Sequence, residues 1–181
     1  MPKSPNGAAK NRYAEGLDRP HDMTRSYIVS AISNRPDQKD VLDRLLLNQQ
    51  DIGNVIKPYY GEAAGNKLAD LLREHILIAG KIVAAAKAGN QADVTKLEAD
   101  WHRNADDIDK FLSAANPKNW QFKELQDMLY MHLQLITEIV VSCIKGDWKA
   151  DIAATDKNEI HMIHLADILT KGIVKQFPGK F

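Results

Sequence analysis

Histidine is the side chain in this sequence whose spacing points most directly to chemistry. His21, His75 and His132 are each followed, seven residues later, by an Ile-Val pair. Seven residues make two helical turns, so the histidine and the isoleucine lie on the same face of a helix. Imidazole is the commonest protein ligand for transition metals, and carboxylates complete such sites. The spacing therefore predicts inward-facing histidines that hold a metal or a cofactor.

Further candidate ligands come from the helices that return beside these histidines. His75 and His132 precede Gly89 and Gly146, where we expect turns, by the same stretch of helix, about 21 Å long. The next helix runs back along the bundle, and after an equal number of residues it reaches the same height along the bundle axis as the histidine. We expect a transition metal at that height (iron, zinc or manganese), and an open coordination position would let it activate water or oxygen. The predicted metal-site residues are His75, His132, His164, Asp167, His161, His102 and Asp106.

The same histidines have a second interpretation. A histidine in the middle of an apolar stripe is commonly a core residue whose ring nitrogens are hydrogen-bonded. The protein is then a non-enzymatic helical interaction or scaffold protein, and the histidines only pack its core. The two hypotheses differ in one observable, which is whether the folded protein retains a metal or a cofactor.

The elements that must position these side chains are helices. Apolar residues recur at three- and four-residue steps after residue 20, and no segment alternates polar and apolar residues as a half-buried strand does. Short connections between long amphipathic helices favour antiparallel neighbours. The sequence therefore predicts an all-α, up-down bundle of about six helices in a single domain of residues 21–181, preceded by a flexible arm of residues 1–20. The helices are expected at residues 21–34, 37–57, 62–88, 91–115, 121–145 and 148–176.

The predicted helices also show signs of a repeat. A shift of 57 residues places His75 on His132 and Gly89 on Gly146, and a shift of 54 residues places His21 on His75. Self-similarity at a fixed period is typical of repeated structural units. The shifts favour three related helical hairpins, although isoleucine and valine are common enough in helices for chance to produce the pattern.

The last predicted helix differs from the others because its second half is apolar on most sides. Ile160, Ile163, Ile168 and Ile173 fall on different sides of that segment. A helix that is apolar all round is typical of a covered, central position. We therefore expect this helix at the centre of the bundle, or covered by a second subunit in a homo-oligomer.

Composition and charge narrow the class of protein. The 24 lysines and arginines balance 24 aspartates and glutamates, so the chain has no excess positive charge for a nucleic-acid backbone. No apolar run approaches the roughly 20 residues of a membrane span, and residues 1–20 lack the apolar segment of a signal peptide. We therefore expect a cytoplasmic protein that binds neither nucleic acid nor membrane. The single cysteine, Cys143, excludes an intramolecular disulfide and a cysteine-based zinc cluster.

Three short helical segments carry a resemblance to known proteins. They are Arg73-Glu74-His75-Ile76, Trp101 with Asn104-Ala105-Asp106-Asp107-Ile108, and the ending Gln176-Phe177-Pro178. From about residue 24 onward the chain resembles a family of small, functionally uncharacterised bacterial helical-bundle proteins. The resemblance implies a helical-bundle fold and assigns no catalytic residues.

More distantly, the histidine-bearing hairpins are similar to ferritin-like and hemerythrin-like bundles. The Glu-x-x-His motif of ferritin-like di-iron proteins is absent from this chain. The hemerythrin-like spacing, a histidine with an acid four residues later, is met only by His102 and Asp106. This similarity therefore implies an architecture and no ligand set.

Overall fold

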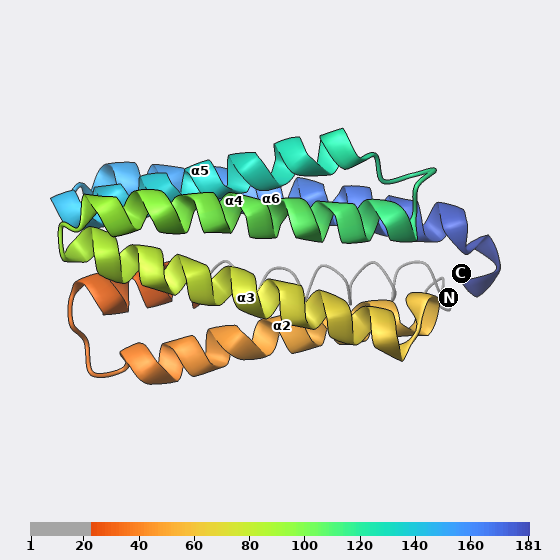
Figure 1. Ribbon diagram of the computed structural model, residues 1–181, viewed down its shortest axis with the longest axis horizontal. Coiled ribbons are helices and arrows are strands. Elements are labelled where there is room, and N and C mark those ends of the chain that lie inside the picture. The colour runs from red at the N-terminus through yellow and green to blue at the C-terminus, as the bar shows by residue number, and fades with distance from the viewer. Residues whose placement is uncertain (1–22) are drawn as a thin grey trace, which may run out of the picture.

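The computed structural model describes residues 23–181, so the predicted arm of residues 1–20 and His21 lie outside the described part. Within that part the chain forms helices and no strand. The prediction of an all-α, up-down bundle of about six helices is confirmed (Figure 1). A short helix at residues 23–32 is followed by α2 (Gln38–Tyr60), α3 (Glu62–Lys87), α4 (Gln91–Ala115), α5 (Phe122–Lys145), α6 (Trp148–Gln176) and the 3₁₀ turn η1 (Pro178–Lys180).

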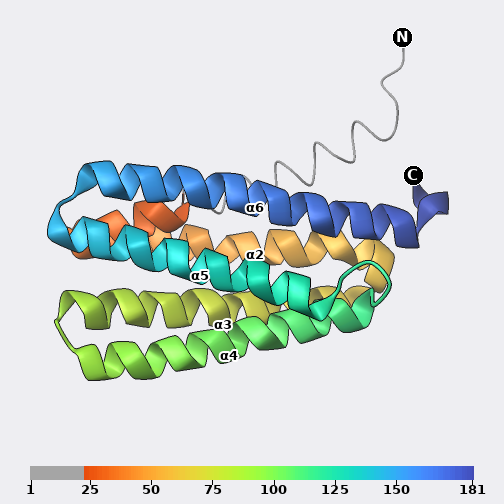
Figure 2. The same cartoon turned by 90° about the horizontal axis from the view of Figure 1, so that it is seen from above.

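Consecutive helices run antiparallel and lie side by side, from α2 on α3 to α5 on α6. Figure 2 shows α6 along one edge of the molecule and α4 along the opposite edge. The short helix at residues 23–32 links distant parts of the chain. Its Arg25 forms an ion pair with Asp151 of α6, and its Ala31 carbonyl accepts a hydrogen bond from Lys87 Nζ of α3 at 2.5 Å.

The predicted turns at two glycines are present in the structure. Gly89 has a φ of 71° and Gly146 a φ of 70°, in the left-handed region that glycine adopts without steric cost. Asn90 begins α4 by accepting a hydrogen bond from the backbone N–H of Asp93 at 3.2 Å. These turns bring α3 against α4 and α5 against α6 in two hairpins.

Helix α2 extends three residues beyond its predicted end at residue 57. Pro58 lies in the last turn, where the missing N–H removes one hydrogen bond from the end of the helix. The Tyr60 ring packs 5.7 Å from Trp120, and the Tyr59 ring packs 5.8 Å from Phe177. Aromatic packing against Trp120 and Phe177 therefore stabilises a turn that the local sequence disfavours.

The prediction that the second half of α6 is central is wrong. Ile160 is 70% exposed and Ile163 is 47% exposed. The buried residues of α6 follow one face of the helix, and they are Asp151, Ala154, Asn158, Leu165, Gly172 and Ile173. Helix α6 lies at an edge of the molecule, so its neighbours cover one side of it.

Helix α5 is the one helix in the described part that is long and apolar enough to cross a membrane by length and composition. Its most apolar window has a mean hydropathy of 1.3, and 39% of that window is buried inside the bundle. Leu125, Leu133 and Ile139 on its inner face are almost completely buried. The core helix of a soluble protein meets the same criteria, so this feature does not place the protein in a membrane.

The ion pair of Arg25 generates a first prediction. Asp151 is completely buried, and Arg25, which is 34% exposed, donates to its two carboxylate oxygens at 2.5 and 3.2 Å. The variant Arg25→Met leaves that carboxylate without its counter-charge, so the free energy of unfolding in urea should fall by about 2–4 kcal/mol.

The control for this variant is Lys39→Met, which breaks the exposed Lys39–Asp43 pair. An exposed pair contributes little, so this change should leave the free energy of unfolding nearly unchanged. Equal losses in the two variants would show that the Arg25–Asp151 pair does not stabilise the attachment of the short helix.

Candidate functional site

A layer of polar side chains crosses the middle of the bundle, and we call His75, Asn104, His132 and Asn158 the polar layer. His75 Nδ1 of α3 lies 2.8 Å from Asn104 Oδ1 of α4, and His132 Nδ1 of α5 lies 2.8 Å from Asn158 Oδ1 of α6. The two imidazole rings are stacked, with centroids 6.1 Å apart and planes 21° apart. The same histidine–asparagine pair thus joins the helices of both hairpins.

The hydrogen bonds of Asn104 define the tautomer of His75. Asn104 Nδ2 donates to the Leu71 carbonyl at 3.2 Å, so its Oδ1 faces His75 and accepts a proton from Nδ1. Nε2 of His75 therefore carries the lone pair. Burial, together with the neighbouring His132, lowers the pKa of His75 to about 3, which keeps the ring neutral at pH 7. A neutral imidazole oriented through one nitrogen is the form that binds metals.

Two of the other predicted ligands are bound to backbone carbonyls. His161 Nε2 lies 2.7 Å from the Met128 carbonyl oxygen across the α5–α6 contact, and His102 Nδ1 lies 2.8 Å from the Glu98 carbonyl oxygen. Each of these ring nitrogens must carry a proton to make its bond. The same nitrogen is then not a metal ligand.

The predicted carboxylates also have other partners. Asp106 accepts hydrogen bonds from Gln126 Nε2 at 2.8 Å and from the Tyr130 hydroxyl at 3.0 Å. His164 and Asp167 lie exposed on the surface of α6. Of the seven predicted residues, the structure brings together His75 and His132. Across residues 23–181, no three histidine, cysteine, aspartate or glutamate side chains gather as a metal-binding group.

The asparagines of the polar layer were missed by the sequence analysis, as was a buried acid. Asp109 of α4 is completely buried, and neither carboxylate oxygen has a hydrogen-bond partner among the residues that the structure describes. Burial, with a smaller effect of Asp106, raises the pKa of Asp109 to about 7. Asn104 and Asp109 both lie within the apolar stripe of α4, and a polar residue in such a stripe indicates a buried polar group. The sequence therefore contained a signal for both residues.

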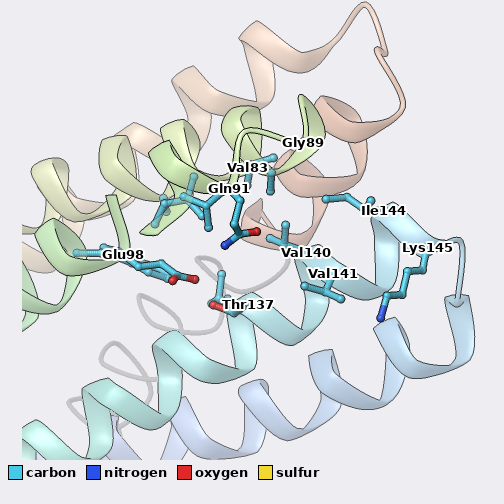
Figure 3. Close-up of a pocket in the computed structure, with 15 residues that line it drawn as sticks. Val83, Gly89, Gln91, Glu98, Thr137, Val140, Val141, Ile144 and Lys145 are labelled. Carbon is cyan, nitrogen blue, oxygen red and sulfur yellow. The ribbon is translucent and has the colours of Figure 1, made fainter. Parts of the chain in front are cut away.

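A cavity of about 260 Å³ lies between α3, α4 and α5, next to the α3–α4 and α5–α6 turns (Figure 3). Its floor is formed by buried side chains, namely Ile82, Val83, Val94, Trp101, Ile136 and Val140. Exposed residues surround its mouth, and they are Gln91, Val141, Ile144 and Lys145. The cavity is therefore an apolar pocket that opens to solvent.

Few polar groups line this cavity. Figure 3 shows Gln91, Glu98 and Thr137 directed toward one another across it. The Thr137 hydroxyl donates to the Leu133 carbonyl at 3.0 Å, which leaves its oxygen as an acceptor. Glu98 is half-buried, and its carboxylate makes no ion pair within the described residues. Glu98 and Thr137 thus present hydrogen-bond acceptors to the cavity, whereas the Gln91 amide presents both donors and an acceptor.

Trp101 connects the cavity with the polar layer. Its side chain lines the cavity, and its ring lies 5.2 Å from that of His75. The indole N–H is buried and has no hydrogen-bond partner in the described part. The cavity and the paired histidines are therefore adjacent parts of one region of the bundle.

Comparison with known protein families, with curated proteins and with solved structures finds no match to this chain. The resemblance to a bacterial helical-bundle family, and the more distant similarity to ferritin-like bundles, stay predictions. The all-α bundle is established by the structure alone.

Two of the buried titratable groups, Asp109 and His75, should give opposite dependences of stability on pH. Asp109 has a raised pKa, so its contribution is fully present below its ordinary value of 3.8 and is lost as pH rises through 7. His75 has a lowered pKa, so its contribution is present above 6.5 and is lost as pH falls toward 3. Between about pH 4 and 6.5 the two effects on the free energy of unfolding have opposite signs and should cancel.

The variant Asp109→Asn should separate these contributions. At pH 8 it removes a buried charge, so the free energy of unfolding in urea should rise by on the order of 2–3 kcal/mol, and near pH 4 it should change little. Between pH 4 and 6.5 its stability should rise with pH, because the effect of His75 is no longer opposed. The control Asp107→Asn removes an exposed carboxylate, so its stability should depend on pH as that of the wild type does. Destabilisation of Asp109→Asn at pH 8 would show that the carboxylate is favourably bound.

Proposed function

We propose that this protein binds a small, largely apolar molecule, a ligand or a cofactor, in the cavity between α3, α4 and α5. The observation that carries the proposal is the cavity itself, with an apolar floor, an open mouth and a few convergent polar groups. Ligand sites in helical bundles have this composition. An apolar cavity of about 150 Å³ holds a benzene molecule, so 260 Å³ suits a molecule with one or two rings.

The arrangement of the helices supports a pocket that exists before a ligand binds. In Figure 2, α5 lies near α4 at the end of the bundle where residues 116–121 join them, and it separates from α4 toward the α5–α6 turn. Small side chains of α3, Ala79 and Ala86, face the space between these helices. The walls are three regular helices, so binding requires little ordering of the chain.

Binding of 2-phenylethanol, a neutral one-ring molecule, tests the proposal. We expect saturable changes in ¹H–¹⁵N NMR shifts at cavity residues of α3, α4 and α5, with a Kd on the order of 1 mM. The variant Ala86→Leu places three extra carbons in the cavity and should raise the Kd at least about tenfold.

The control is Ala84→Leu, because Ala84 is exposed on the same helix and does not line the cavity. This variant should bind 2-phenylethanol as the wild type does. If the shifts are absent, or are the same in both variants, the cavity is not a binding site for such molecules.

A metal bound by His75 and His132 is a second candidate function. Its support is the pairing of both Nδ1 atoms with asparagine, since metal-binding histidines are commonly oriented through their other nitrogen. Iron, zinc or manganese would need further ligands, because structural and catalytic zinc sites use at least three protein ligands. Ferritin-like and hemerythrin-like centres also use carboxylates, so the cavity is the better supported site.

Thermal unfolding with excess Fe²⁺, Zn²⁺ or Mn²⁺ tests this candidate. A metal that binds only the folded state should raise the wild-type Tm by about 5 °C. His75→Ala and His132→Ala should abolish the rise, whereas His164→Ala, at an exposed position, should retain it. A wild-type Tm that does not respond to any of these metals removes the candidate. The histidines are then core residues, as the alternative of an interaction or scaffold protein requires.

A further inference from the structure

The charge of the cavity is set by Glu98. Among the described residues it is the only acidic one in the lining, which is otherwise mainly apolar. A half-buried carboxylate beside apolar side chains loses part of its hydration without gaining a counter-ion from the described residues. A ligand that brings a positive charge would supply the missing interaction.

Thr137 complements Glu98 because its oxygen is an acceptor. The Thr137 proton is used in the bond to the Leu133 carbonyl, so the hydroxyl offers lone pairs to the cavity. Figure 3 shows Glu98 and Thr137 on facing helices, directed toward the same space. A primary ammonium group has three N–H donors, and it can therefore satisfy the carboxylate and the hydroxyl oxygen together.

The one cationic side chain that lines the cavity within residues 23–181 lies at its other end. Lys145 is exposed at the end of α5, and Figure 3 shows it on the opposite side of the view from Glu98. It therefore leaves the charge of Glu98 unneutralised. The rest of the lining consists mainly of aliphatic side chains and the aromatic ring of Trp101, which favour a hydrocarbon or aromatic body.

We infer that the cavity selects small apolar primary amines, with the ammonium group bound by Glu98 and Thr137 and the apolar body on the floor around Trp101. This inference rests on the proposed function, since it names the class of ligand for the same cavity. It goes beyond that proposal by assigning specificity to one carboxylate.

Three probes of nearly equal size test the inference: 2-phenylethylamine, 2-phenylethanol and 3-phenylpropionate, which are cationic, neutral and anionic at pH 7. The amine should bind about tenfold more tightly than the alcohol, because a charge-assisted hydrogen bond replaces a neutral one. The carboxylate should bind most weakly. Kd values come from ¹H–¹⁵N NMR titrations that follow the cavity residues.

The variant Glu98→Gln keeps the shape of the side chain and removes its charge. It should bring the Kd of 2-phenylethylamine to within about twofold of that of 2-phenylethanol, whose own affinity should stay the same. The matched control is Glu138→Gln, since Glu138 follows Thr137 in the chain but does not line the cavity. This control should retain the preference for the amine.

The outcomes separate the two claims. If 2-phenylethanol binds in the cavity but the amine shows no preference, or if Glu98→Gln retains the preference, the inference of an amine site is overturned and the binding cavity stands. A preference for 3-phenylpropionate also overturns it, and would point to Lys145. If no probe binds, the proposed function fails and the inference fails with it.

Discussion

The hydrogen bonds between the histidine and asparagine side chains of the polar layer constrain both hairpins of the bundle. An imidazole in an apolar core is costly unless its polar atoms are paired, and each pair here joins two antiparallel helices. Sliding one helix by a single residue would move its asparagine about 1.5 Å along the axis and about 100° around it, which would break the pair. The pairs therefore select the register of α3 with α4 and of α5 with α6. The turns at Gly89 and Gly146 agree with that register.

Burial shifts the pKa values of Asp109 and His75 in opposite directions, and in both residues it favours the neutral form. The pKa of His75 falls and the pKa of Asp109 rises, because each charged form loses hydration. The two sites differ in their partners. His75 is oriented by Asn104, whereas Asp109 lacks a partner in the described part of the chain. Paired groups of this kind specify the packing, and an unpaired one reduces stability wherever it is ionised.

The cavity depends on the same register. Trp101 lies three residues before Asn104 on the same buried face of α4, so pairing of Asn104 with His75 places the indole ring beside the imidazole. On its other side the ring faces a space that small residues of α3 leave open. A ligand in the cavity would contact Trp101, which lies against the polar layer. The proposed binding site and the buried histidines are thus linked through one aromatic side chain.

The sequence by itself determined the helices, their turns and the height of the histidines along the bundle. These features follow from the period of apolar residues and from glycine at the turns, which are local properties. The tertiary structure decided which side chains meet at that height. His75 and His132 meet each other and two asparagines, while His164 and Asp167 face solvent because neighbours cover one side of α6. Position along a helix can be counted from the sequence, but direction around the bundle depends on which neighbours pack on each face. The separation of α5 from α4, and with it the cavity beside Glu98, likewise arises from packing between helices and has no counterpart in the sequence period.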